Sequence, residues 1–585
     1  MTAYRTSLAL IGLLALAGTA VAQSDPPPAA TGAPTPLGAP APAAPATSDE
    51  PPPAPVEFKP GILGKPAQTA VTTGDLGIVD GPPAGTLDDS KGGLGQSMWI
   101  NAPRGDVEDL LGRVPLVTAD PFVRGLARRL VLTISDAPIG PAKRALVTIR
   151  IEKLLQGGLI DEAGAIAASF HLDNDPDFAR VQADALLYAG REKDICGDLT
   201  ATRLTSPEPF WLQLRTFCFA AGGDNDSADL TLAVLDSQGI KDAALDLLFA
   251  DVLTGKKTAP GAIDRPTALH IYLLRKAGLP VTNAIAAKLG TAANLLAARE
   301  TRNSAADRLS AAARISATGA LGPAEMLALI GAQTIPAAQI AQAQAVAAKL
   351  TFLPAQALLH RAATLESRPP EKANLLLAAM AAPERLPLTS LLHVNILLTL
   401  KPDATTHPLL ARALILAGKP DAAAALYPSG AAEDTDLAAF RVLIDLAAPN
   451  PARDAAAQAA YGWFAKNAAP QQKPSAAAAL SLGLSDVLRR PMPPDARALS
   501  GTLQGMHWDG TRPAPDAVRK MVQAASEPGR KGEALLRLLD IVGADGPAKL
   551  PADVTIECVR VLSQLGMNTE ARALAVEALA LTRAP

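Results

Sequence analysis

The sequence predicts an all-α protein: an α-solenoid of stacked antiparallel helix pairs that follows a disordered Pro/Ala linker and an irregular arm. Three observations predict this architecture. Of the 585 residues, 49% are hydrophobic but only 3% are aromatic, and such an Ala/Leu-rich composition disfavours β-sheet. Apolar residues recur at helical spacing from Asn101 onward. Glycine turns then return at a nearly constant interval along part of the chain.

The composition also excludes several classes of protein. The net charge is only −3, from 54 Lys and Arg against 57 Asp and Glu, whereas a dedicated nucleic-acid binder needs a basic surface. Three cysteines are too few for a disulfide-dense scaffold. The high apolar fraction excludes a chain that is disordered throughout.

Residues 1–22 are expected to be a secretory signal peptide. Arg5 supplies a positive charge, Leu8 to Leu16 is an apolar core, and Ala20-Val21-Ala22 is a small-residue cleavage site, so cleavage is expected between Ala22 and Gln23. The alternative is an uncleaved anchor, which would need about 20 apolar residues. We therefore expect export, to the periplasm first and to the medium as a second possibility, with no integral membrane segment after cleavage.

Two segments without helical periodicity come next. Residues 23–56 form a Pro/Ala-rich linker that is expected to be disordered, because twelve of the 33 residues from Ser24 to Val56 are proline and such tracts favour extended polyproline II. A spacer is the simpler interpretation, and a ligand for a proline-binding partner is the alternative. Residues 57–100 are predicted to be an irregular arm, in which Met98-Trp99-Ile100 anchors the start of the folded body.

Residues 101–585 are predicted to form the α-helical repeat body. Val107, Leu110 and Leu111 recur at helix spacing. Later segments show the same spacing of apolar residues and are separated by Gly, Pro or Asp residues. Bends between subarrays are expected where Pro and charged residues cluster, near 256–265, 385–387, 490–494 and 511–515.

A repeat is visible in the glycines. Gly158, Gly190 and Gly223 lie 32 and 33 residues apart, and the same local pattern returns at Gly418 and Gly566. A glycine in the left-handed conformation closes a helix at its C′ position, so that the next helix turns back. A residue suited to a helix interface follows each glycine five positions later: Ala163, Ile195, Ala228, Ala423 and Ala571.

These junctions resemble those of tetratricopeptide-like repeats, whose helix-turn-helix unit is about 34 residues long. The resemblance covers Leu155 to Phe170, Leu414 to Tyr427 and Leu562 to Leu574. It implies a tetratricopeptide-like or related α-solenoid, although the family's first-helix Trp and Tyr are missing and the period drifts beyond about residue 255. A weaker resemblance, over Leu76 to Thr133, is to uncharacterised exported helical proteins of alphaproteobacteria, and it implies no known activity.

No complete catalytic, cofactor-binding or metal-binding motif is found in the sequence. The Asp173-Asn174-Asp175-Pro176-Asp177 run lacks the Gly and Glu of a calcium loop and is better explained by helix capping before Phe178. Glu366-Ser367 is the dipeptide that lytic transglycosylases use, but its companion motif is missing. The histidines are dispersed, with none at i,i+4 from another: His171, His270, His360, His393, His407 and His507. We therefore expect no catalytic residue, no cofactor and no metal.

The cysteines carry one specific hypothesis. Cys196 lies early in one predicted helix and Cys218 late in the next, and both are 10 to 11 residues from the turn near Ser206-Pro207. The two arms of an antiparallel hairpin would place them face to face, and export permits oxidation. We predict a Cys196–Cys218 disulfide, with two buried thiols as the alternative and Cys558 as a lone thiol.

Taken together, the sequence predicts an exported, non-enzymatic scaffold or adaptor that binds a protein or peptide partner in the bacterial cell envelope, because stacked helix pairs form extended binding surfaces. One alternative is a cell-wall or carbohydrate-binding protein, although only four Trp and five Tyr are available. The other is an enzyme without a recognisable motif, for which convergent carboxylates with perturbed pKa values in a pocket would be the sign.

Overall fold

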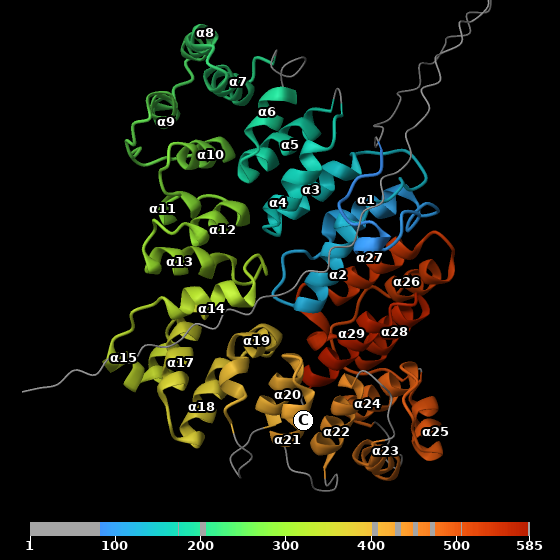
Figure 1. Cartoon of the computed structure of the whole chain (residues 1–585). Helices are drawn as coiled ribbons and strands as arrows, with labels where there is room; N and C mark the ends of the chain where they lie inside the picture. The colour runs from blue at the N-terminus through green and yellow to red at the C-terminus, as the bar shows by residue number, and fades with distance from the viewer. Residues whose placement is uncertain are drawn as a thin grey trace, which may run out of the picture. The chain divides into compact units, whose positions relative to one another are not determined.

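The computed structural model describes residues 82–172, 175–198, 206–400, 408–426, 434–448, 454–468, 474–504 and 506–582. Within these ranges the chain is all-α and contains no β-strand, which confirms the predicted fold class (Figure 1). Only isolated bridges pair extended residues there, as between Leu87 and Thr133. None of the described helices combines the length and the hydropathy that crossing a bilayer requires.

The helices follow one another with short connections. In chain order they are α1 (Arg104–Arg113), α2 (Pro121–Leu132), α3 (Leu146–Gln156), α4 (Ile160–Ala168), α5 (Pro176–Ala189), α6 (Glu192–Asp198), α7 (Pro209–Ala221), α8 (Asn225–Ser237), α9 (Ala243–Thr254), α10 (Ala268–Lys276), α11 (Asn283–Ala286), α12 (Thr291–Arg299), α13 (Ala305–Ile315), α14 (Pro323–Gly331) and α15 (Ala337–Ala341). The second half comprises α16 (Ala343–Ala347), α17 (Phe352–Leu365), α18 (Pro369–Ala379), α19 (Leu386–Leu397), α20 (Pro408–Leu416), α21 (Pro420–Leu426), α22 (Thr435–Ala447), α23 (Ala455–Ala468), α24 (Ala476–Val487), α25 (Pro494–Leu503), α26 (Ala517–Ser526), α27 (Lys531–Val542), α28 (Ala552–Gln564) and α29 (Asn568–Leu581). The described ranges also contain the 3-10 turns η1 (Asp89–Lys91), η3 (Pro383–Arg385) and η4 (Gly546–Lys549).

Successive helices pack as pairs. Extensive contacts join α7 to α8, α12 to α13, α22 to α23 and α26 to α27. A single helix cannot bury its apolar stripe alone, so each pair must also rest on its neighbours. Accordingly, one main apolar core extends from Ala84 to Leu581, and Thr73–Pro585 forms one compact unit. The described part of the chain is thus a helical-repeat type of fold.

The five repeat-turn glycines share one local geometry. Their φ angles lie between 72° and 80°, the left-handed region in which a side chain would be strained. The amide that follows each glycine donates to the carbonyl five residues earlier at 2.8–2.9 Å, the bond that closes a Schellman motif. The residues five positions after each glycine are all buried: Ala163, Ile195, Ala228, Ala423 and Ala571. At these turns the chain reverses direction, and the next helix is packed against the core within its first turns.

The described end of the arm is part of the body. Trp99 is fully buried, and its indole N–H donates to the carbonyl of Asp136 at 2.7 Å. The guanidinium of Arg150 lies 5.2 Å from the centre of the Trp99 ring and also donates to Ser135 Oγ at 2.5 Å. Met98 is buried as well, whereas Ile100 is 42% exposed. Residues 57–81 of the arm lie outside the described ranges.

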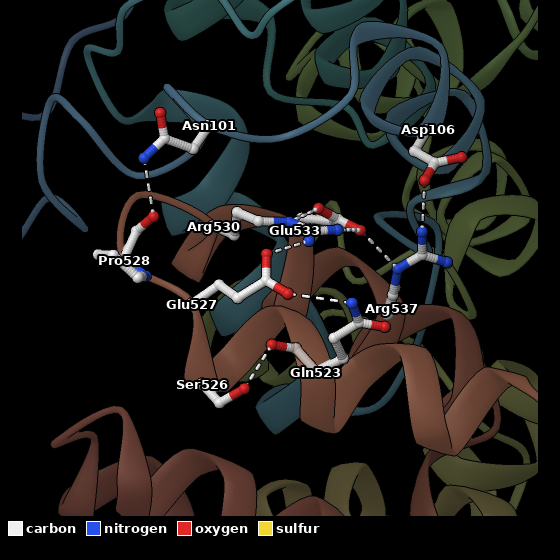
Figure 2. Close-up of polar contacts among 9 residues, drawn as sticks. All are labelled: Asn101, Asp106, Gln523, Ser526, Glu527, Pro528, Arg530, Glu533 and Arg537. Carbon is white, nitrogen blue, oxygen red and sulfur yellow. Dashed lines mark hydrogen bonds and ion pairs between the residues drawn. The ribbon is translucent and has the colours of Figure 1, made fainter.

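The N-terminal helices pack against the C-terminal ones. Helix α1 contacts α27, and α2 contacts both α27 and α29. Figure 2 shows the polar part of this contact: Glu533 of α27, fully buried, accepts hydrogen bonds from Arg530 and Arg537. Arg537 also donates to Asp106 of α1 at 2.7 Å, and Asn101 donates to the carbonyl of Pro528 at 3.0 Å. Ion pairs and apolar contacts therefore join the two ends of the body.

Three of the four segments where bends are expected fall between helices, and the fourth runs from the α18–α19 connection into the start of α19. The segments near 256–265, 490–494 and 511–515 separate α9 from α10, α24 from α25 and α25 from α26. At 385–387, however, η3 leads directly into α19, which begins at Leu386. Pro387 lies in the first turn of α19, where the missing N–H removes no intrahelical hydrogen bond. A proline here starts a helix and makes no break.

Candidate functional site

A cavity of about 700 Å³ opens between α24, α25, α26 and α28. The loop of residues 504–515, of which residue 505 is outside the described ranges, forms its remaining side. This volume is typical of binding pockets, which are mostly apolar with a few convergent polar groups.

The walls of the cavity are apolar. Val518 and Val522 of α26 face the cavity from one side, and Val554 and Ile556 of α28 from another. Trp508 is only 5% exposed, and its indole N–H donates to the carbonyl of Pro474 at 3.3 Å. This hydrogen bond fixes the ring where it lines the cavity. An apolar group that enters this cavity would replace water along most of its surface, which is favourable.

A polar group stands at the edge of the cavity. Arg512 donates from its two terminal nitrogens to the two oxygens of Asp553, at 3.0 and 3.1 Å, in a bidentate ion pair. His507 lies 3.4 Å from Asp553 through Nδ1, and its side chain is 79% exposed. Glu557 and Arg560 form a second ion pair along α28. Charges of both signs therefore surround an apolar interior.

The Asp553 carboxyl is held in its ionised form. Burial would raise its pKa, but the hydrogen bonds from Arg512 and His507 outweigh burial, and the pKa lies below its ordinary value. Asp553 also occupies the first turn of α28, where a negative charge is favoured. A carboxylate in this state can orient a ligand but is a poor proton donor at neutral pH.

Backbone geometry holds the loop against the cavity. Gly510 has a φ of 149°, and a Cβ there would lie 2.8 Å from the backbone nitrogen of Pro551. The amide of Thr511 donates to the carbonyl of Lys549 at 2.8 Å. Within α24, a Cβ at Gly483 would clash with Ile556, so that glycine allows α24 and α28 to approach closely. Two glycines thus position the loop and one wall.

The structure places the predicted cysteines together. Cys196 of α6 and Cys218 of α7 form a disulfide with a Cα–Cα distance of 5.3 Å, inside the range that disulfides require. Cys558, in α28, is a fully buried free thiol. Burial, with the nearby charge of Glu557, raises its pKa to about 12, so this thiol is unreactive at neutral pH.

Two other motifs from the sequence are structural. Asp175 accepts the amide of Phe178 at 2.9 Å and caps α5, while Asp173 lies outside the described ranges. Glu366 accepts hydrogen bonds from Arg368, which lower its pKa to about 2. It is therefore ionised at neutral pH and unsuited to the acid role of a lytic transglycosylase. The cleavage site at Ala22 and Gln23 is outside the described residues.

Within the described ranges no group of three or more His, Cys, Asp or Glu side chains is placed so that it could hold a metal ion. No family model, no curated protein and no solved structure matches this chain. The function must therefore be argued from the chain itself. What its cavity offers is shape, apolar surface and a fixed ion pair at the edge.

No motif in the sequence predicts this cavity. Its only signals were the Pro-rich break at 511–515 and the neighbouring His507-Trp508 pair. The walls come from four separate helices between Ala476 and Gln564, so no pattern within one helix marks them.

Proposed function

We propose that this chain is an exported scaffold or adaptor that binds an apolar segment of a protein partner in the bacterial cell envelope. The single observation that carries the proposal is the cavity between α24, α25, α26 and α28, with apolar walls and the Arg512–Asp553 ion pair at its edge. Large apolar pockets with a polar edge are typical of binding sites.

A peptide segment fits these features better than a compact polar metabolite. The cavity has room for several apolar side chains. An amphipathic helix that binds in a groove presents such a set of side chains on one face. Arg512 and Asp553, together with Glu557 and Arg560, offer both charges to the polar face of such a segment. Edge charges of this kind favour one orientation of the partner more than they add affinity.

Two further features support export and a repeat architecture. The Cys196–Cys218 disulfide is of the kind that persists in oxidising compartments such as the periplasm, and residues 1–22 have the pattern of a signal peptide. The glycine turns support a tetratricopeptide-like class, because each reverses the chain and docks a buried residue five positions on. Mass spectrometry of the envelope fraction should find a mature chain that begins at Gln23.

Photocrosslinking tests the binding site. A photoreactive amino acid is introduced at Gln504, an exposed residue at the cavity, and in a separate variant at Gln238, an exposed residue after α8. We expect the same protein adduct repeatedly at position 504 and none at 238. Equal labelling at both positions, or a glycan adduct without protein, would contradict a protein-binding cavity.

A pair of valine substitutions gives the matched control. Val522→Asp places a charge in the apolar wall, whereas Val234→Asp places the same charge on a valine that is 38% exposed in α8. The first variant should lose the crosslinked partner while keeping its helical circular dichroism, and the second should retain it. If Val522→Asp folds and still captures the partner, the partner binds elsewhere.

A further inference from the structure

Two histidines that are 33 residues apart meet between α17 and α19. His360 Nδ1 and His393 Nδ1 are 3.4 Å apart, and the ring centres are 5.3 Å apart. His393 is fully buried, whereas His360 is partly exposed. The pair therefore has one rigid member inside the fold and one member that reaches solvent.

The neighbours of His393 determine which ring nitrogen carries its proton. Gln356, itself buried, donates through Nε2 to the carbonyl of Ala379 at 2.9 Å, so its amide oxygen faces His393. His393 Nε2 lies 2.6 Å from that oxygen and must be the donor. In the neutral ring, His393 Nδ1 then has a free lone pair directed at His360. Histidines that bind metals have this arrangement, with the second nitrogen bonded to an acceptor.

The spacing of the two Nδ1 atoms suits a tetrahedral metal ion. Two zinc–nitrogen bonds of about 2.0–2.1 Å that meet at a tetrahedral angle hold their nitrogens about 3.3–3.4 Å apart. A square-planar site would bring the same atoms closer, to about 2.8–3.0 Å. The observed distance of 3.4 Å is also compatible with a long hydrogen bond from His360 Nδ1–H to His393 Nδ1.

We propose that His360 and His393 bind one Zn²⁺ through their Nδ1 atoms, with Gln356 as the group that orients His393. In the neutral chain His360 only has to carry its proton on Nε2 for both Nδ1 lone pairs to become available. Within the described ranges no third His, Cys, Asp or Glu joins the pair. The remaining coordination positions are therefore filled by water on the side of His360, and the ion is exchangeable.

The site lies between α17 and α19 and shares no residue with the cavity, so the two proposals can fail separately.

Zinc titration of the untagged, chelator-treated mature chain tests the site. Isothermal titration calorimetry near neutral pH should find one Zn²⁺ per wild-type chain, and Co²⁺ should give the visible absorption of a tetrahedral complex. His360→Ala should weaken binding by more than about tenfold, and Gln356→Ala by about tenfold, as the loss of an orienting group does. His507→Ala is the matched control, because His507 is 79% exposed and remote in the sequence; it should bind zinc like the wild type.

Two results would overturn the proposal. One is a wild-type chain that binds no zinc and gives no tetrahedral Co²⁺ spectrum. This result is obtained without any variant. The other is a His360→Ala chain, folded by circular dichroism, that binds zinc as tightly as the wild type; the zinc would then belong to another site.

Discussion

The carboxyl group of Glu577, in α29, lies against the carboxyl group of Asp120, the N-cap residue of α2. Both are buried, at 5% and 4% exposure, and a Cβ at Gly546 would lie 2.0 Å from Asp120 Oδ2 and 3.2 Å from Glu577 Oε1. Asp120 Oδ1 accepts the amide of Val123 at 2.8 Å and so caps α2. Burial, together with the hydrogen bond to Asp120 and its charge, raises the pKa of Glu577 well above its ordinary value.

The free energy of unfolding should therefore decrease as pH rises. Because the folded state keeps the proton of Glu577 above the ordinary pKa of 4.5, it binds more protons than the unfolded state in that range. The stabilisation is complete below that value and is lost as pH rises through the raised pKa, with a slope of up to about 1.4 kcal/mol per pH unit. Urea unfolding midpoints measured across pH, compared with those of Glu577→Gln, check this. A slope that is unchanged in the variant would refute the assignment.

The buried ion pairs of Figure 2 should be worth far more than the exposed one beside them. Glu533→Ala removes the buried partner of Arg530 and Arg537 and should lower the free energy of unfolding by about 3–5 kcal/mol. Glu527→Ala removes a half-exposed carboxylate that accepts from Arg530 and Gln523, and its effect should be small, because pairs open to water are screened. Chemical denaturation of both variants tests the contrast, and equal effects would contradict it.

Two glycine turns should differ in their tolerance of alanine. Gly158 and Gly418 share the left-handed conformation, and alanine there costs about 1 kcal/mol. A Cβ at Gly158 would also lie 2.5 Å from Ala320 Cβ, whereas nothing lies within 4 Å of a Cβ at Gly418. Gly158→Ala should thus cost about 1–3 kcal/mol more than Gly418→Ala. Denaturation midpoints of the two variants test this difference. Equal losses of stability would mean that the segment around Ala320 shifts to accommodate the new Cβ at no cost.

The Cys196–Cys218 disulfide closes a loop with a sequence separation of 22 residues. In the chain-entropy model such a crosslink stabilises the fold by about 3 kcal/mol, so Cys196→Ser with Cys218→Ser should lose about that much. Alkylation of the native mature chain should label no cysteine, and after denaturation without a reductant it should label Cys558 alone. Labelling of all three cysteines under the second condition would show that the bond does not form in the cell.

Features that depend on nearby residues were predictable from the sequence. The turn glycines and the residues five positions later follow from the geometry of one helix end, and Asp175 caps its own helix. Cys196 and Cys218 occupy the two arms of one hairpin, so symmetry about its turn was enough to pair them. At 385–387 the local pattern was ambiguous, because Pro387 suits a first helical turn as well as a break.

The sequence by itself determined the helical class, the places where helices reverse and the pairing within a hairpin, because these depend on interactions over one or two helical turns. Only the tertiary structure decided which distant side chains meet: His360 with His393, Asp120 with Glu577, and the walls of the cavity around Trp508. Those contacts depend on how each helix pair rotates and slides on its neighbours. Ala and Leu can replace one another at these positions. They determine which face of a helix is buried but not which residues of two packed helices meet, so the periodicity of the sequence does not predict these contacts.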